Sequence, residues 1–397
     1  MVVAQFNDSF KPIMDGVGLC VENYTRWLDA KHGTAYAVVP HVPRYQDNDP
    51  FPIVRYPSLP LLIMPPYRLG IPWASPPVGK LLTHTPFDLV HSHSPFIAGR
   101  MAQRTARRHA IPHVTTFHTK YREDARRYLR SERLAEIFIN RIVRFYDSCD
   151  AVWTPSEATR GILRSYGYQG DITIAPNGSD LSPPTPQEYA RYRLRGAAMA
   201  GVPEDAFVFL FVGQHRWEKN VKLIIRSIGR LHERDGLPCP IALVFAGEGY
   251  ASEMMRRLAM RAGIGEQTRF LGRIVGRERI KGLYARADLF FFPSIYDNAP
   301  LVMREAAAFG VPTIVAEGSS AAEAIVDGKN GFAVPNDPDA AADIIYKLLH
   351  NRALIERVGD DASRTVYRGW EEIVDWVAAQ YEQIISRRVR RSRKLFV

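Results

Sequence analysis

The sequence predicts an α/β protein built from two Rossmann-like domains, each with a parallel sheet covered by helices on both faces. Three observations point to this fold class. Short, almost continuously apolar segments recur along the chain, separated by segments with helical periodicity. They form two series, divided by a proline-rich stretch without a strand-like run. The length of 397 residues suffices for two domains, each with its own core.

Strands are expected in both halves of the chain. The first half contains the segments MVVAQF (1–6), AYAVVP (35–40), PIVRYP (52–57), FDLVHS (87–92), HVTTFH (113–118), DAVWTPS (150–156) and DITIAPN (171–177). The second half contains FVFLFVG (207–213), IALVFAG (241–247), TRFLGRI (268–274), DLFFFPS (288–294), VPTIVA (311–316) and GFAVPN (331–336). Helical patterns such as 251–263 and 302–309 lie between them.

The connection between the domains is expected at residues 181–205, which open with a proline-rich turn. We place the domains at 1–195 and 196–370, followed by a C-terminal helix and basic tail at 371–397. The stretch 369–389 reads as one amphipathic helix. Ligands of doubly wound sheets sit beyond the carboxyl ends of the strands, and two facing domains create a cleft, so the informative residues should follow strands.

The formal net charge of +10 is concentrated in two places. Residues 100–144 hold twelve Arg and Lys against four acids, and the tail RRVRRSRK (387–394) adds six cations. An anionic partner, either membrane or nucleic acid, is therefore plausible. No apolar run could span a bilayer, and the N-terminus shows no secretory signal. The three cysteines form no metal or redox pattern, which fits a reducing cytoplasm.

A glycine turn and several charged side chains follow the first strand of the second half, in FVGQHRWEKN (211–220). Arg216 and Lys219 stand just before an expected helix. Cations and free N–H groups at a helix N-terminus both favour a phosphate group. A solvated loop with scattered charge is the alternative.

Histidines follow two strands of the first half. His118 lies in VTTFHTKY (114–121), where a neutral imidazole can exchange a proton or bind a sugar hydroxyl; a structural hydrogen bond is the alternative. His91 and His93 are expected to line the cleft. No acidic or cysteine partner follows them at useful spacing, so a metal is not expected.

The segment FFPSIYDNAPLVMREAAAFGVPTIV (291–315) runs from a strand through a loop into a helix. Pro300 suits the first turn and Asn298 a cap, which predicts a helix start near 299–300. Free N–H groups near Leu301 and Val302 would offer a second anion site.

Two carboxylates of this segment stand eight residues apart. Compensation of the helix dipole, worth about 0.3–1 kcal/mol, explains Asp297 adequately. It explains Glu305 poorly, because the effect fades beyond the first turn. Glu305 therefore needs another partner.

These motifs together resemble the retaining glycosyltransferases of family 4, which have the GT-B fold, and most closely the bacterial diacylglycerol glucosyltransferase type. The matching pieces span about residues 1–335 in family order: NDSFKPIMDGV, DLVHSHSPF, TTFHTKY, APNGSD, VGQHRWEKN, FLGRI, the 294–310 segment and DGKNGFAVP. The resemblance implies an acceptor-binding first domain, a second domain that binds a nucleotide sugar, and a C-terminal helix that crosses back to the first domain.

The resemblance also implies roles for individual residues. The family's pair of acids falls on Asp297, one methylene shorter than the usual Glu, and on Glu305, which passes to the ribose. The usual phosphate-binding Arg falls on Gln214, so Arg216 is its expected substitute beside Lys219. The donor side further includes Asp15, Gly16, Val17, Arg273, Asn298, Ala299, Pro300, Leu301 and Val302. His118 lies beside the transferred sugar, and His93 and Tyr121 belong to the acceptor side.

The expected reaction is transfer of a hexose from a nucleoside diphosphate sugar, similar to UDP-glucose, to an acceptor hydroxyl with retention. His118, Asp297 and Lys219 are the expected catalytic residues, and no cofactor or metal is needed. Interleaved apolar and basic residues over 124–146 are typical of a helix lying on an anionic membrane, which predicts a lipid acceptor and a peripheral position at the inner membrane face. A solvated Arg face on a core helix is the alternative.

Three other functions stay open: transfer to a soluble acceptor, epimerisation of a nucleotide sugar, and nucleic-acid binding by the basic patches. The last is disfavoured because no nucleic-acid motif or aromatic stacking platform is present, and no nucleic-acid partner is expected.

Overall fold

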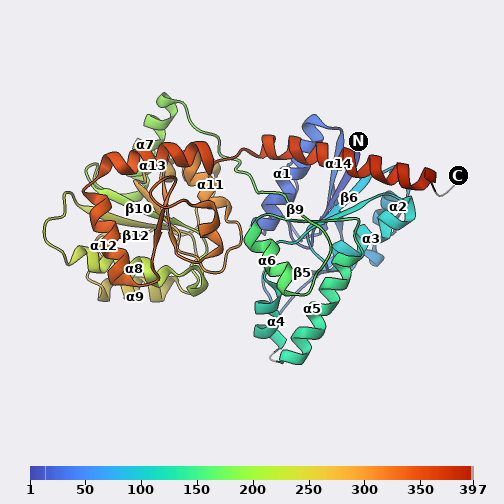
Figure 1. The fold of residues 1–397 in the computed structure, drawn as a ribbon, viewed down its shortest axis with the longest axis horizontal. Coiled ribbons are helices and arrows are strands. Elements are labelled where there is room, and N and C mark those ends of the chain that lie inside the picture. Colours follow the sequence, from blue (N-terminus) through green and yellow to red (C-terminus); the bar gives the residue numbers. More distant parts are fainter. Residues whose placement is uncertain (14, 130, 395–397) are drawn as a thin grey trace. The chain divides into compact units, whose positions relative to one another are not determined.

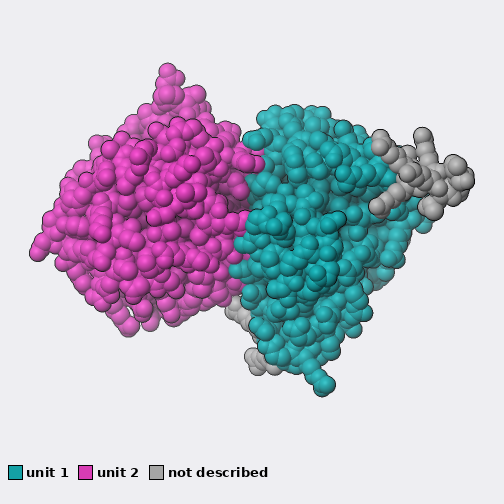
Figure 2. Space-filling view, viewed as in Figure 1, with its two compact units in different colours: residues 1–177, 370–397 teal, residues 178–369 magenta. Residues whose placement is uncertain are grey.

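The computed structural model describes residues 1–13, 15–129 and 131–394. They belong to two compact units: unit 1 comprises residues 1–177 and 370–397, and unit 2 comprises residues 178–369 (Figures 1 and 2). Each unit contains one parallel sheet, which confirms the predicted pair of Rossmann-like domains. All thirteen predicted segments contain a strand. None of the described helices is long and apolar enough to cross a bilayer.

The sheet of unit 1 has seven parallel strands in the order β3-β2-β1-β6-β7-β8-β9. The strands are β1 (Val2–Phe6), β2 (Thr34–Pro40), β3 (Ile53–Tyr56), β6 (Leu89–Ser92), β7 (His113–Thr116), β8 (Ala151–Thr154) and β9 (Ile172–Ile174). The chain builds outward from β1 to β3 and then returns to the other side of β1. The order of the strands therefore reverses between β1 and β6, where ligands of such sheets bind.

The helices of unit 1 are α1 (Gly16–Lys31), α2 (Pro76–His84), α3 (Ile97–His109), α4 (Tyr121–Leu129), α5 (Glu132–Asp147), α6 (Glu157–Ser165) and α14 (Trp370–Lys394), with the 3-10 turn η1 (Pro72–Ala74). The helical stretch expected over 124–146 is two helices, α4 and α5. Ser131 begins the second of them, because its hydroxyl caps α5 by accepting from the Leu134 N–H.

Unit 1 also contains an antiparallel hairpin, β4 (Ser58–Pro60) with β5 (Arg68–Gly70), which the sequence did not predict. Prolines at 57, 60, 65 and 66 interrupt this stretch and hide its strand pattern.

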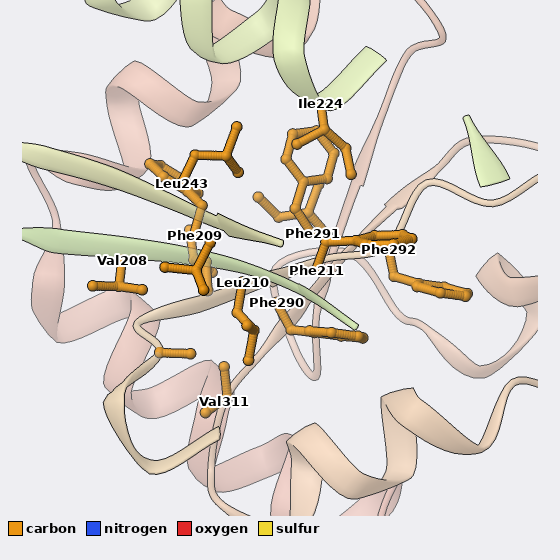
Figure 3. Close-up of a cluster of buried hydrophobic side chains, with 14 of the residues drawn as sticks. Val208, Phe209, Leu210, Phe211, Ile224, Leu243, Phe290, Phe291, Phe292 and Val311 are labelled. Carbon is orange, nitrogen blue, oxygen red and sulfur yellow. The ribbon is translucent and has the colours of Figure 1, made fainter. Parts of the chain in front are cut away.

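The sheet of unit 2 has six parallel strands in the order β12-β11-β10-β13-β14-β15. They are β10 (Phe207–Val212), β11 (Ile241–Ala246), β12 (Thr268–Phe270), β13 (Leu289–Phe291), β14 (Thr313–Ala316) and β15 (Phe332–Val334). Phenylalanines of β10 and β13 are fully buried in the core beside Ile224 (Figure 3). Burial on both faces explains the unbroken apolar runs, and the strand order reverses between β10 and β13.

The helices of unit 2 are α7 (Pro186–Ala200), α8 (Val221–His232), α9 (Ser252–Arg261), α10 (Arg277–Arg286), α11 (Leu301–Ala308), α12 (Pro338–Leu349) and α13 (Arg352–Thr365), with 3-10 turns η2 (Trp217–Lys219) and η3 (Ser320–Ala324). The expected connection 181–205 is thus mostly the helix α7, which packs closely on α10. The structure divides the chain at 177/178, earlier than the expected 195/196, because α7 belongs to unit 2.

The C-terminal helix α14 belongs to unit 1, as the fold class predicted, and packs against α1. Val374, Val377 and Tyr381 are fully buried along one face of α14. The basic tail predicted at 387–394 continues this helix, and its side chains beyond Arg388 lie outside those that the structure describes.

Candidate active site

The loops that follow β10 and β13 meet at the point where the strand order of unit 2 reverses. The loop after β10 packs closely against the loop after β11. A Cβ added to Gly247 of the second loop, whose φ is +143°, would lie 1.8 Å from the Gly213 carbonyl oxygen of the first. Only glycine fits such an approach in this conformation. The glycine turns therefore fix the segment that carries Arg216 and Lys219.

Lys219 and Asp297 form an ion pair between these two loops. The Lys219 ammonium lies 2.5 and 2.6 Å from the two Asp297 carboxylate oxygens. The loop of Asp297 is set by Ser294, whose buried hydroxyl accepts from the Asp297 N–H at 3.3 Å. Both side chains keep partial exposure, 16% and 21%, so the pair remains reachable from solvent. The structure thus brings together two of the three predicted catalytic residues.

The helix α11 begins at Leu301, with Pro300 at its N-cap and no side-chain cap hydrogen bond. The predicted cap by Asn298 is therefore wrong, and Asn298 and Ala299 lie in the loop ahead of the helix. The first-turn N–H groups of Leu301 and Val302 stand at the predicted position and on partly exposed residues. They can serve an anion there.

Glu305 is buried, with 4% exposure, and already has partners inside unit 2. Arg277 Nη1 lies 3.2 Å from its Oε1, and the Tyr284 hydroxyl donates to its Oε2 at 2.8 Å. Burial raises the pKa of Glu305, whereas Arg277 and Tyr284 oppose that rise. Glu305 thus already has protein partners that the sequence did not reveal, and each carboxylate oxygen retains capacity for a further hydrogen bond.

Arg277 joins Glu305 to Asp180 of the APNGSD motif. Its Nε donates to Asp180 Oδ2 at 2.6 Å, and Nη2 contacts Oδ1. Arg277 stands in the first turn of α10, where a cation opposes the helix dipole, so the two carboxylates must compensate it. The sequence did not predict Arg277 and Tyr284, because neither lies in a recognised motif. Asp180 is the last residue of the APNGSD motif, which could have indicated it.

The remaining cations of the predicted donor site are placed differently. Arg216 pairs with Glu218 at 3.4 Å, and its side chain is about one-third exposed. Arg273 is exposed, and its backbone N–H donates to the Glu248 carboxylate at 3.2 Å. Gln214 is exposed as well. Arg216 is close to Lys219 in sequence, but a phosphate group that binds Arg216 would have to compete with the Glu218 carboxylate.

Asp15, Gly16 and Val17 belong to unit 1, at the start of α1. Asp15 caps that helix by accepting from the Gly18 N–H at 2.6 Å, and it also accepts from the Ser9 hydroxyl at 2.7 Å. Burial raises the pKa of Asp15. A Cβ on Gly16 would meet nothing within 4 Å, so space remains open beside this backbone.

His93 and His118 lie together at the carboxyl ends of β6 and β7, with His93 Nδ1 3.1 Å from His118 Nε2. The two rings stack, with centroids 5.3 Å apart. His118 keeps partial exposure, and enclosure of its ring lowers its pKa to about 3. His91 and His93 are buried at 0% and 1%, so the expectation that they line a cleft is wrong: His93 contacts His118, and the His91 ring stacks on His93.

Tyr121, predicted on the acceptor side, is buried at 6% among Phe117, Tyr146 and Tyr166. The Phe117 ring makes an edge-on contact with it, and burial raises its pKa. Tyr121 is therefore a core residue, because α4 turns it inward against α5 rather than toward solvent. Within the described residues, no three His, Cys, Asp or Glu side chains are placed to hold one metal ion.

Two family models match the chain. The model described as Glycosyltransferase Family 4 matches residues 14–183, and the model described as Glycosyl transferases group 1 matches residues 198–365. The second match contains Lys219, Asp297 and Glu305, and the first contains His118.

Curated relatives carry related names at modest identity. The chain is 27% identical to a D-inositol 3-phosphate glycosyltransferase of Streptomyces griseus, over 77% of this chain and 69% of that protein. It is 24% identical to an alpha-monoglucosyldiacylglycerol synthase of Streptococcus pneumoniae, over 88% of this chain and 78% of that protein.

Solved structures share the fold. HepE of Anabaena in complex with UDP superposes with a TM-score of 0.74 and 17% identity, covering 96% of this chain and 100% of that one. Sucrose-phosphate synthase of Thermosynechococcus elongatus gives a TM-score of 0.76 and 18% identity, covering 97% and 99%. With both domain models matched in sequence and two parallel sheets in the structure, the chain belongs to the family 4 glycosyltransferases and has the GT-B fold.

Proposed function

We propose that the protein transfers a hexose from a nucleoside diphosphate sugar, with UDP-glucose as the leading candidate, to an acceptor hydroxyl with retention of configuration. The Lys219–Asp297 pair at the strand-order reversal of unit 2 carries this proposal, because it holds a cation against the loop that leads into the N-terminus of α11. The structural relative HepE binds UDP and, in another crystal structure, UDP-glucose, which supports this donor class.

Departure of the diphosphate is the demanding step of this reaction, because negative charge grows on the leaving group. Lys219, with Arg216 and the N–H groups of Leu301 and Val302, would stabilise that charge. The departing phosphate oxygen would itself accept the proton of the acceptor hydroxyl, so no separate base is required. The sequence predicts no metal for this chemistry, and unchanged turnover in excess chelator would support that prediction.

The sugar and ribose would be held by other residues. Asp297, Asn298 and His118 would orient the sugar, while Glu305 would add a ribose hydroxyl to its bonds with Arg277 and Tyr284. The shorter Asp297 side chain reaches less far than Glu, so donor-sugar preference is where this protein should differ from its relatives.

A donor screen tests the proposal. UDP-, GDP- and ADP-sugars are incubated with and without lipid extract, and the released diphosphate and the anomeric configuration of the product are measured. One donor should turn over, and Lys219→Ala or Glu305→Ala should abolish most transfer. Unchanged transfer in both variants would remove the assignment, and conversion of the donor without acceptor would indicate an epimerase.

For the acceptor, we propose a lipid at an anionic, cytoplasmic membrane surface. On α5, Leu134 and Ile137 are 50% and 48% exposed and stand beside the exposed Arg133 and Arg141. Exposed apolar side chains flanked by cations suit an anionic lipid surface. The alpha-monoglucosyldiacylglycerol synthase relative supports a lipid acceptor.

Vesicle binding tests this part. Sedimentation with vesicles containing phosphatidylglycerol should recover the protein at low salt, and the variant Leu134→Gln with Ile137→Gln should stay in the supernatant. Leu194→Gln, at a 65% exposed leucine of unit 2, is the matched control. Full retention of binding by the α5 variant would contradict the proposal.

A soluble phosphorylated acceptor is the second candidate, because several relatives are D-inositol 3-phosphate glycosyltransferases. Transfer to inositol phosphate without lipid would favour it. Thermal stabilisation by oligonucleotides rather than by nucleoside diphosphates would instead favour a nucleic-acid binder.

A further inference from the structure

A chain of buried hydrogen bonds runs from the C-terminal helix α14 to His118. Tyr381 of α14 accepts from the Gln5 amide, with Nε2 3.2 Å from the hydroxyl oxygen. Gln5 Oε1 lies 2.9 Å from His93 Nε2, and His93 Nδ1 lies 3.1 Å from His118 Nε2. Tyr381, Gln5 and His93 are buried at 0–1%, whereas His118 keeps partial exposure. The buried chain therefore ends at a partly exposed residue, His118.

Gln5 sets the direction of every bond toward His118. An amide oxygen can only accept, so His93 must donate from Nε2 to Gln5 Oε1. A neutral imidazole has one N–H, so His93 Nδ1 must accept. His118 therefore donates from Nε2, and its Nδ1 carries the lone pair. Burial lowers the pKa of His93, and enclosure lowers that of His118, so both rings are neutral near pH 7.

The other side of Tyr381 is consistent with the same direction. Because its oxygen accepts from Gln5, its hydroxyl is available to donate to His91 Nδ1, 2.5 Å away. His91 then holds its proton on Nε2 and donates to the Thr116 hydroxyl at 2.8 Å. Tyr381, Gln5, His93 and His91 can then each donate one hydrogen bond and accept one, so the directions along the network agree.

We propose that Tyr381 is a positioning residue which, through Gln5 and His93, fixes the Nε2–H tautomer and the ring orientation of His118. The role of this tautomer in transfer rests on the proposed function, in which His118 orients the sugar. A C-terminal helix that merely docked on unit 1 would need only apolar contacts, such as those of Val374 and Val377. The hydroxyl of Tyr381 adds direction to that contact.

The variant Tyr381→Phe tests the inference, because it keeps the ring that stacks on Trp153 and removes only the hydroxyl. Long-range ¹H–¹⁵N spectra of full-length, histidine-labelled protein distinguish the protonated ring nitrogen, with His118→Gln used to assign the signal. We expect wild-type His118 to be protonated on Nε2 and Tyr381→Phe to show a mixture of tautomers. We also expect kcat to fall about tenfold, with the KM for donor changed by less than about twofold.

Gln5→Met is the second variant, since it cuts the same chain with a side chain of similar size and no charge. It should reproduce the tautomer change, and Tyr381→Phe should add nothing in its background. Val377→Ala, one turn earlier on the buried face of α14, is the control: it weakens docking but should leave the His118 spectrum as in wild type.

An unchanged His118 spectrum in a folded Tyr381→Phe or Gln5→Met protein would overturn the inference. The same holds if Val377→Ala alters the tautomer equally, because docking alone would then explain the effect. If no nucleotide sugar reacts, the proposed function is contradicted. The spectra would still show whether Tyr381 fixes the tautomer of His118.

Discussion

Lys219 and Asp297 hold each other by two contacts, 2.5 and 2.6 Å from the ammonium nitrogen to the two carboxylate oxygens. A diphosphate that binds at Lys219 must therefore compete with Asp297 for the same ammonium. An aromatic ring also lies near this ammonium group, since Lys219 Nζ is 5.8 Å from the centroid of Phe292. The pair thus couples the residue expected to bind phosphate to the residue expected to bind sugar.

Asp297→Asn should strengthen binding of the nucleoside diphosphate while reducing transfer. Removing the carboxylate charge frees Lys219, and a part-exposed ion pair is worth up to about 1 kcal/mol, so affinity should rise by up to about fivefold. Calorimetric titration with UDP measures the change. In a Lys219→Ala background the gain should vanish, and weaker UDP binding by Asp297→Asn alone would contradict the competition.

Lys219→Ala should lower kcat by about a hundredfold or more, because a group that stabilises developing charge is worth several kcal/mol in the transition state. The free energy of unfolding should change by less than about 1 kcal/mol, since the ion pair is partly exposed. Steady-state kinetics and urea unfolding give the two quantities. Lys222→Ala, at an exposed lysine over the Trp217 ring, is the control and should keep full turnover.

Arg277→Met should destabilise unit 2, because it leaves the buried Glu305 carboxylate without its cation. Arg277 is 41% exposed on its side chain, which screens the pair, so we expect a loss of about 1–3 kcal/mol. The exposed Arg279→Met on the same helix should cost far less. Urea unfolding measures both variants.

The pH dependence of Arg277→Met gives a second check. Burial raises the pKa of Glu305 in the folded protein, so the folded state binds more protons than the unfolded state just above the usual carboxyl range. Stability then falls as pH rises through the folded pKa. Without Arg277 this pKa should rise further, and the deficit should be larger at pH 8 than at pH 5. A deficit that grows on acidification would contradict this account.

The strands were predictable because β10, β11 and β13 are buried on both faces. Their sequences are therefore almost continuously apolar, which is the pattern expected for strands of a covered parallel sheet. The domain boundary at 177/178 was harder to predict, because the sequence of α7 resembles a polar linker. Only the structure shows that Gly196 of α7 packs closely against α10. The hairpin β4–β5 escaped prediction because its prolines mimic a loop.

Lys219 and Asp297 both follow strands of one parallel sheet, and they meet because such strands bring their carboxyl ends to the same edge. Partners from distant elements could not be predicted: Arg277 and Tyr284 reach Glu305 from α10. Tyr121 shows the opposite failure. It follows a histidine strand end in sequence, but the helix rotation that buries it depends on packing against α5, which no local pattern reveals.

Unit 1 should lose stability on mild acidification because burial lowers the pKa of several of its histidines. His113, buried at 2%, has its pKa lowered to about 4. Between that value and the ordinary histidine range, the unfolded chain binds a proton that the folded chain does not, so stability rises with pH there. The free energy of unfolding should therefore fall from pH 7 to pH 5. His113→Gln should flatten this slope, whereas the exposed His84→Gln should leave it unchanged.

Two glycines inside helices should respond to alanine with opposite signs. Gly196 of α7 lies against α10, where an added Cβ would approach the Gly282 carbonyl oxygen to 1.9 Å. Gly196→Ala should force the two helices apart and cost about 1–3 kcal/mol, as overpacking does.

Gly161 of α6 is the matched control, because a Cβ there would meet nothing within 4 Å. Gly161→Ala should stabilise the protein by about 0.5–1 kcal/mol through helix propensity alone. Urea unfolding of both variants separates packing from propensity. A stabilising Gly196→Ala would mean that α7 does not pack on α10 as described, and would return residues 181–205 to the role of a linker between the units.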